Sequence, residues 1–137
     1  METKIRRIDY FHATVKDRPG EAFEVLSRLR KSGVNLLAFS AVPSGLGNTQ
    51  LVLFPEDAND LARGASESDI VLVGPQRAFL AQGDDELGAL AEIHRKLFEA
   101  SVNVYASNGV TDGKGGYGYI IYVKPEDFEK AAHSLGV

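Results

Sequence analysis

KDRPGEAFEVLSRLRKSGVN, residues Lys16 to Asn35, is the stretch that decides the fold. It reads as the end of a strand, a tight turn, one amphipathic helix and the start of the next strand. The chain contains this pattern twice, because DDELGALAEIHRKLFEASVN occupies Asp84 to Asn103. Gly20 and Gly88 each precede an asparagine by 15 positions, and the two copies are offset by 68 residues. A repeat of this length predicts two copies of one structural unit.

Composition bounds the class of protein. The chain has 137 residues, of which 44% are hydrophobic and 25% charged, as in a soluble globular protein of one domain or two small ones. The net charge of −4 and the scattered basic residues argue against nucleic-acid binding. The absence of cysteine excludes disulfides, thiol nucleophiles and thiolate metal sites. No apolar run approaches the ~20 residues of a membrane span, and METKIRRIDY does not read as a secretory signal, so a cytoplasmic location is expected.

The first half predicts the element order β-α-β-β-α-β. Strands are expected at Ile8–Val15, Val34–Pro43, Thr49–Phe54 and Ile70–Val73, with helices after Gly20 and from Ala58 to about Ala65. In the first helix Ala22, Val25, Leu26 and Leu29 form an apolar stripe, and Gly33 is a stop signal. This order is that of the ferredoxin-like sandwich, an α+β fold with both helices on one face of an antiparallel sheet.

The second half repeats the order up to its last helix. A strand is expected at Ala78–Gln82, and the predicted hairpin pairs Val102–Val110 with Tyr117–Lys124. The helical stripe between them comprises Leu87, Leu90, Ala91, His94, Leu97 and Phe98. Pro125-Glu126-Asp127 matches Pro55-Glu56-Asp57 at an offset of 70, and the two extra residues are assigned to the hairpin loop.

The second unit is predicted to lack its last strand. The counterpart of Ile70–Val73 would begin beyond Val137. An unpaired sheet edge favours pairing with another segment or another subunit, so an oligomer or an exchanged strand is expected. The predicted division places the first unit at residues 1–74 and the second at residues 75–137.

Two motifs carry a family resemblance. Asp17-Arg18-Pro19-Gly20, followed after the helix by Gly33-Val34-Asn35-Leu36, resembles the signature of the ACT-domain family. The resemblance covers nearly all of both halves and is stronger in the first, since Asp85-Glu86-Leu87-Gly88 and Ala100-Ser101-Val102-Asn103 have lost the arginine, the proline and the helix-stop glycine. It implies tandem regulatory domains that sense small effectors, typically amino acids, at interfaces between domains paired side by side through their sheets.

The predicted ligand site lies where the first helix of each unit begins. A helix start offers unpaired N–H groups and a positive dipole end to a ligand carboxylate. A short carboxylate such as Asp17 receives an ammonium group, and Asn35 offers both a donor and an acceptor. The site residues predicted from these roles and from the resemblance are Asp17, Arg18, Pro19, Gly20, Asn35, Leu36, Asp85, Gly88 and Asn103. The first copy is predicted to carry more of the binding than the second.

Each of these residues also has a structural interpretation. Asp17 and Asp85 suit plain helix caps, and Gly20 and Gly88 suit tight packing of a helix start. Asn35 and Asn103 suit turn residues that bond their own backbone. These alternatives stay open at the level of sequence.

The remaining polar signals point away from catalysis. His94 aligns with Leu26 in the repeat, which predicts a partly buried, hydrogen-bonded histidine on the core face. His12, His94 and His133 lack metal-ligand spacing, so no metal or cofactor is expected. The glycines at 113–118 join two predicted strands, whereas a phosphate-binding loop joins a strand to a helix.

The sequence therefore predicts a non-catalytic regulatory or sensor protein that binds a small effector, an amino acid, at the interface between ACT units. A ligand bridging two units would stabilise one arrangement for a partner to read. The expected partners are the effector, further copies of the chain through sheet edges, and an enzyme regulated in trans. Two alternatives remain: an assembly or regulatory subunit of an amino-acid biosynthetic enzyme without its own ligand, and a small enzyme on a ferredoxin-like scaffold.

Overall fold

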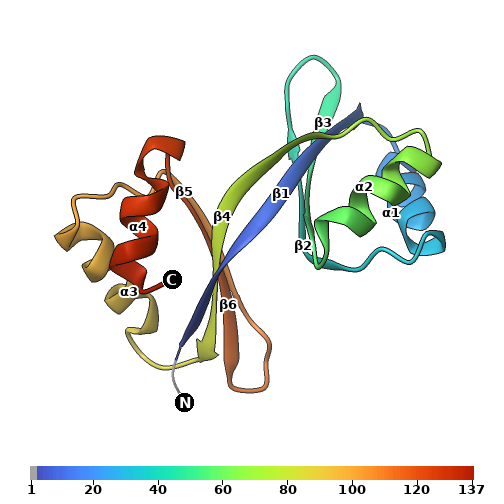
Figure 1. The fold of residues 1–137 in the computed structure, drawn as a ribbon. Helices are drawn as coiled ribbons and strands as arrows, with labels where there is room; N and C mark the ends of the chain where they lie inside the picture. The colour runs from blue at the N-terminus through green and yellow to red at the C-terminus, as the bar shows by residue number, and fades with distance from the viewer. Residues whose placement is uncertain (1–2) are drawn as a thin grey trace. The chain divides into compact units, whose positions relative to one another are not determined.

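The computed structural model describes residues 3–137, which form an α+β fold of six strands and four α-helices (Figure 1). In chain order the elements are β1 (Lys4–Lys16), α1 (Glu21–Lys31), β2 (Leu36–Pro43), β3 (Asn48–Pro55), α2 (Ala58–Glu67), β4 (Val73–Asp84), α3 (Ala89–Glu99), β5 (Ala106–Thr111), β6 (Gly116–Tyr122), the 3-10 helix η1 (Pro125–Asp127) and α4 (Phe128–Leu135). The predicted α+β class and the predicted alternation of strands and helices are confirmed.

The strand order is β2-β3-β1-β4-β6-β5, and β3 and β6 pair antiparallel with their neighbours. The chain divides into two compact units. The first unit is Asp9–Gln76; the second is Arg77–Val137 together with the residues up to Ile8. Strands β1 and β4 therefore contribute to both units. This division differs from the predicted split between residues 74 and 75, because the N-terminal residues group with the second unit.

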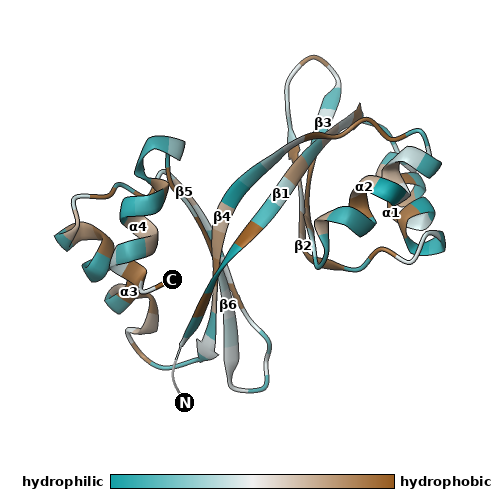
Figure 2. Ribbon diagram, viewed as in Figure 1, coloured by the Kyte–Doolittle hydropathy of each residue, from teal (hydrophilic) through white to brown (hydrophobic). Residues whose placement is uncertain are grey.

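In the first unit, helices α1 and α2 cover one face of the strands (Figure 1). The sides of the helices that face the strands carry apolar residues (Figure 2). Seven buried residues form the core: Phe11, Ala13, Val25, Leu29, Leu51, Leu53 and Leu61. The predicted alternation along β1 and the predicted stripe of α1 both supply members of it. Gly33 has a φ of 76° and follows the last turn of α1, as the stop signal predicted.

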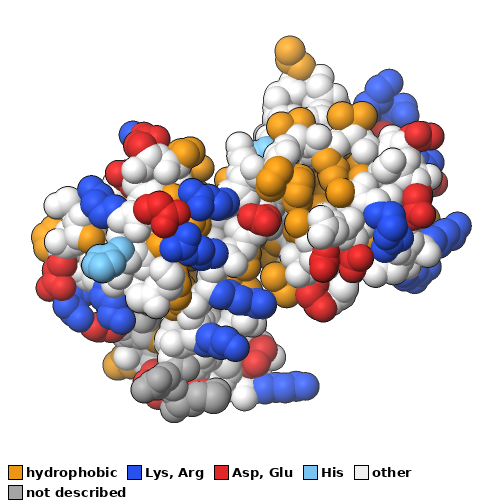
Figure 3. Space-filling model, viewed as in Figure 1, with side chains coloured by type: hydrophobic (Ala, Val, Ile, Leu, Met, Phe, Trp, Pro, Cys, Tyr) orange, Lys and Arg blue, Asp and Glu red, His pale blue; other side chains and the backbone are white. Residues whose placement is uncertain are grey.

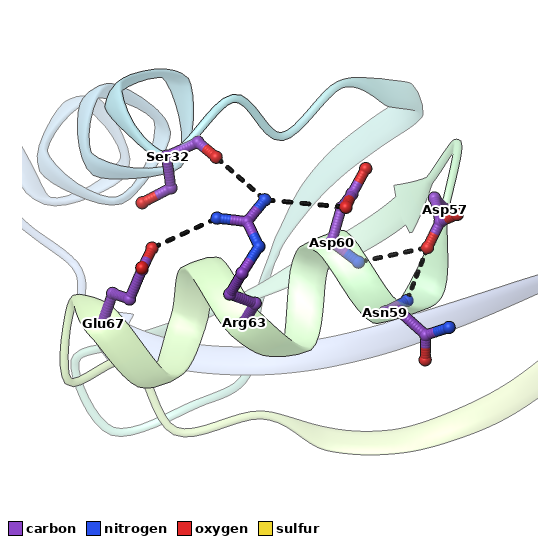
Figure 4. A network of polar contacts seen from close by, with 6 residues as sticks. All are labelled: Ser32, Asp57, Asn59, Asp60, Arg63 and Glu67. Carbon is purple, nitrogen blue, oxygen red and sulfur yellow. Dashed lines mark hydrogen bonds and ion pairs between the residues drawn. The ribbon is translucent and has the colours of Figure 1, made fainter.

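Polar contacts fix the start of α2 and join this helix to the end of α1 (Figure 4). The Asp57 carboxylate caps α2, accepting hydrogen bonds from the N–H groups of Asn59 at 2.8 Å and Asp60 at 3.1 Å. The Arg63 guanidinium donates to the carbonyl oxygen of Ser32 at 3.1 Å. It also pairs with two acidic side chains of its own helix, Asp60 and Glu67. These contacts are exposed, so they orient the helices more than they stabilise them.

In the second unit, α3 and α4 pack on one face of β4 and β6 (Figure 1). The buried core comprises Phe79, Ala81, Ile93, Leu97, Val102, Tyr117, Tyr119, Ile121, Val123, Phe128, Ala131, Ala132 and Leu135. At its centre the rings of Phe79 and Phe128 are stacked, with centroids 4.4 Å apart. The predicted stripe of α3 is partly wrong, because Leu87 precedes the helix and Phe98 is exposed, whereas Ile93 and Leu97 lie four residues apart and face the core together.

The strand registers show where the two extra residues of the second half lie, which is not in the hairpin loop. Phe79 pairs with Ile121 as Phe11 pairs with Leu53, so both paired strands keep the offset of 68. The hairpin loops are therefore equal in length, and the assignment of the extra residues to the hairpin is wrong. They lie between β6 and α4, where Pro125–Asp127 form η1.

The prediction of two separate strands in this region is wrong. In place of strands at Ile70–Val73 and Ala78–Gln82, the structure has the single strand β4 from Val73 to Asp84. Gly74, which follows the strand predicted to end at Val73, lies within β4. A Cβ at Gly74 would come within 3.0 Å of the Tyr10 carbonyl oxygen. Glycine here serves a close approach to β1 and does not end the strand.

No strand follows α4 in the described part of the chain, and residues of β1 up to Ile8 accompany this unit instead. Arg7 donates to Glu129 of α4 at 3.1 Å and to the carbonyl oxygen of Val137 at 3.1 Å. Arg77 donates to the same Glu129 oxygen at 3.0 Å. Arg7 and Arg77 hold the pKa of the Glu129 carboxyl below its ordinary value by hydrogen bonding. The side-chain hydroxyls of Thr3 and Tyr117 are 3.0 Å apart.

Ser101 takes the place that Gly33 holds in the first unit. Its φ of 59° is left-handed, which costs a residue with a side chain about 1–2 kcal/mol. Replacing Ser101 by glycine would remove this cost, but the greater freedom of glycine in the unfolded chain offsets part of the stability gained. We therefore expect Ser101→Gly to raise the free energy of unfolding by roughly 0.5–1 kcal/mol, measured by urea denaturation. The reciprocal Gly33→Ser is the control and should destabilise by a similar amount; equal stability of all three chains would contradict the argument.

Candidate functional site

The four residues of the Asp17-Arg18-Pro19-Gly20 turn are all exposed at the end of β1. The Asp17 N–H donates to the Gly47 carbonyl oxygen of the β2–β3 loop at 2.8 Å. The N-cap of α1 is Gly20, in the left-handed region with a φ of 91° and without a side-chain cap. The interpretation of Asp17 as a helix cap is therefore wrong, and its carboxylate is left exposed beside the helix start. Arg18 lies 3.6 Å from Glu21 of α1.

The second turn has the same geometry although its sequence differs. The Asp85 N–H donates to the Gly115 carbonyl oxygen at 2.8 Å. Gly88 is the N-cap of α3 with a φ of 81°, again without a side-chain cap, so Asp85 is not a cap either. Glycine is required at both N-caps by this backbone conformation, which explains why it survives in both copies.

The asparagines lie away from these turns within their own units. Lys16 pairs with Asn48 at the start of β3, whereas Leu36 pairs with Pro55 at its end. Seven strand steps separate the two ends, about 23 Å at 3.3 Å per residue. The exposed Asn35 instead donates to Glu56 at 2.7 Å. The turn and Asn35–Leu36 do not meet in one unit, so a single ligand cannot touch both there; Asn103, also exposed, precedes β5 in the equivalent place.

A cavity of about 770 Å³ opens at the second turn. It is lined by residues 85–91 of the turn and α3, 109–111 of β5 and 117–119 of β6. Its lining includes the predicted site residues Asp85 and Gly88. The carboxyl-bearing residues of the lining are Asp85 and Glu86, and no lysine or arginine lines the cavity. The space adjoins β5, whose six residues are all exposed.

A chain of polar side chains lies against this cavity. The His94 imidazole Nε2 is 2.7 Å from the Tyr119 hydroxyl, and that hydroxyl donates to the Ser107 Oγ at 2.9 Å. With its hydrogen given to Ser107, the Tyr119 hydroxyl accepts from the Nε2–H of His94. Tyr119 is 6% exposed and lines the cavity. The prediction of a partly buried, hydrogen-bonded His94 is confirmed. Sequence reasoning missed Tyr119 and Ser107, although the repeat aligns them with apolar residues and so marks them as unusual.

The first unit has a smaller cavity of about 400 Å³ between β1, α1 and the segment before β4. Val71 and Val73 line it and are exposed. Apolar side chains gather over this part of the first unit in Figure 3. The lining of this first-unit cavity includes both acidic and basic side chains, namely Glu21, Glu24 and Arg28. The charged side chains that line the second-unit cavity are all carboxylates.

Two features of the described residues bear on other functions. Within residues 3–137, no three histidine or acidic side chains gather closely enough to hold a metal ion. None of the helices in that range is long and apolar enough to cross a membrane.

Known proteins resemble this chain in structure. Protein BT0572 from Bacteroides thetaiotaomicron matches with a TM-score of 0.78 at 14% identity, covering 96% of this chain and 88% of the other. The ligand-free regulatory subunit of aspartate kinase from Thermus thermophilus matches with a TM-score of 0.64 at 13% identity, covering 98% and 94%. Aspartokinase alpha and beta subunits match with a TM-score of 0.57 at 13% identity, covering 98% and 95%. No family model and no curated protein matches the sequence.

The chain has an ACT-type fold. The resemblance seen at the Asp17–Gly20 turn is thus matched by the architecture over nearly the whole chain. At these identities the likeness establishes the fold alone.

Proposed function

We propose that this ACT-type chain is a non-catalytic regulatory protein that binds a small effector, an amino acid. The observation that carries the proposal is the 770 Å³ cavity at a helix start, where α3 begins without a side-chain cap. The Ala89 N–H already donates to the Glu86 carbonyl oxygen at 3.1 Å, so the N–H groups of the next two residues, Leu90 and Ala91, are the ones offered to a carboxylate, and Asp85 beside them suits an ammonium group. The shared fold with a regulatory subunit of aspartate kinase supports a regulatory role.

The proposal includes two ferredoxin-like units. In the first unit the strand order is β2-β3-β1-β4, and in the second it is β5-β6-β4-β1. Both orders are the same when each copy is numbered from its own first strand. We propose that residues Lys4–Ile8 of β1 take the place of the last strand that the second copy lacks.

The proposed mode of action is linkage. Because each turn and its asparagine lie at opposite ends of a strand, a ligand that uses both must join two units. The exposed edge strand β5 offers a place for a second copy of the chain. An effector held between copies would favour one arrangement, which an enzyme partner would read in trans.

A thermal-shift panel of the twenty amino acids tests the effector proposal. A ligand at about 100 times its Kd adds about 2.7 kcal/mol to the stability of the folded state, so the melting temperature should rise by several degrees. A sugar phosphate and a nucleotide serve as unrelated control ligands. If no amino acid raises the melting temperature while an enzyme co-purifies with the chain, the alternative of an assembly subunit without its own ligand replaces the proposal.

A further inference from the structure

The two units place different side chains at three equivalent positions. In the second unit these are His94, Ser107 and Tyr119, which form the hydrogen-bonded chain. At the common offset of 68, the first unit has Leu26, Phe39 and Leu51. The registers fix this correspondence, because Ala38 pairs with Phe54 as Ala106 pairs with Tyr122.

The polar set is not needed to form the fold. The first unit has three apolar residues at these positions, of which Leu51 is completely buried in the core and Phe39 packs against that core. Burying a tyrosine hydroxyl costs stability unless it is hydrogen-bonded, so the second unit needs His94 and Ser107 to offset a cost that the first unit avoids. A buried tyrosine hydroxyl that is hydrogen-bonded by two further side chains beside a cavity indicates a role in ligand binding and not in folding.

Other substitutions between the copies open the space around Tyr119. A Cβ at Gly109 would lie 2.9 Å from the Tyr119 ring, so glycine lets the ring lie against β5; the first unit has Ala41 there. Ala91 lines the cavity on α3, where the first unit has the much larger Phe23. Tyr119, held at its hydroxyl from two sides, thus becomes a fixed wall of an open cavity.

The lining indicates the chemical class of the ligand. Leu87, Leu90, Ala91 and Val110 give the cavity an apolar side, and the side chains of Leu87 and Val110 are exposed. The charged side chains of the lining are carboxylates, which attract an ammonium group and repel an acidic side chain. No basic residue of the lining offers a partner to a second ligand carboxylate.

We propose that the second unit, and not the first, is the effector site, and that it takes an amino acid with a large apolar side chain packed against Tyr119. This inference rests on the proposed function and narrows it. It also reverses the expectation that the first copy, with its Asp-Arg-Pro-Gly turn, carries more of the binding.

Calorimetric titration with leucine, phenylalanine and aspartate tests the inference on matched variants. Ala91→Phe places in the second unit the residue that α1 already tolerates at this position, and it should raise the Kd for leucine or phenylalanine at least tenfold. Phe23→Ala, the reciprocal change in the first unit, should leave the Kd within twofold. The triple variant His94→Leu, Ser107→Phe, Tyr119→Leu carries the first unit's residues and should also lose binding while its circular dichroism stays unchanged.

The outcomes separate the two proposals. Aspartate binding as tightly as leucine or phenylalanine, or unchanged binding by Ala91→Phe and by the triple variant, would overturn the inference while the proposed function stood. Loss of binding in Phe23→Ala alone would place the site in the first unit and overturn it as well. If no member of the full amino-acid panel binds the wild-type chain, the proposed function fails and the inference fails with it.

Discussion

Phe128→Ala is expected to lower the free energy of unfolding by about 3–5 kcal/mol, the range for removing a fully buried aromatic ring. Phe128 is 1% exposed and stacks on Phe79. The Arg77 guanidinium also lies over the Phe128 ring, 4.0 Å from the ring centroid. Truncation therefore leaves a cavity, ends an aromatic pair and removes a cation–π contact at once. Chemical denaturation monitored by circular dichroism measures the loss.

Phe98→Ala is the matched control for that prediction. Phe98 lies on α3 of the same unit but is 80% exposed. The same truncation there creates no cavity, so the change should stay within about 0.5 kcal/mol. If the two variants lose equal stability, burial is not the cause, and the core assigned to the second unit is wrong.

The parts of the fold that were predictable from sequence are those set by local patterns. Alternation along β1 and helical spacing along α1 each identify a buried face, because the side-chain period follows directly from backbone geometry. Gly33 after the α1 stripe also has a purely local role. The repeat then extends the prediction from one half of the chain to the other.

The errors lie where a residue's role depends on distant partners. A strand was predicted to end at Val73, yet β4 continues through Gly74, where glycine admits the Tyr10 carbonyl of another strand. The grouping of Lys4–Ile8 with the second unit is a contact between the two ends of the chain, which no local period records. The two extra residues, which lie between the end of β6 and η1, were misplaced because an insertion can be located only once the strand registers are known.

In the candidate site, too, the locally determined features differ from those that depend on distant partners. The interpretation of Gly20 and Gly88 as tightly packed helix starts is wrong, because nothing lies within 4 Å of a Cβ added at either; the left-handed N-cap backbone is what favours glycine there. Asp17 was expected to share a site with Asn35, but the direction of β2 puts them at opposite ends of β3. Tyr119 carries no sequence motif. Its importance emerges only when its partners and its counterpart Leu51 are compared.

Removal of residues 1–8 is expected to open the second unit while leaving the first unit folded. The shortened chain begins at Asp9, where the first unit starts. The deletion removes the buried Ile8, the half-buried Ile5 and the contacts of Arg7 with Glu129 and Val137. Burial of the two isoleucines alone amounts to about 3 kcal/mol, and β4 also loses a neighbouring strand.

Hydrogen exchange resolves this loss by position, since about 3 kcal/mol corresponds to roughly a 100-fold faster exchange from the opened state. The amides of residues 77–84 in β4 should show this increase, whereas those of β3 should keep their protection. Arg6→Ala is the control within the same strand, because Arg6 is exposed and its truncation removes no buried surface. Unchanged protection of residues 77–84 in the shortened chain would mean that Lys4–Ile8 does not serve as the last strand of the second unit. The sheet of the second unit would then be complete without Lys4–Ile8. The pairing of these residues with β4 would not contribute to the stability of that unit.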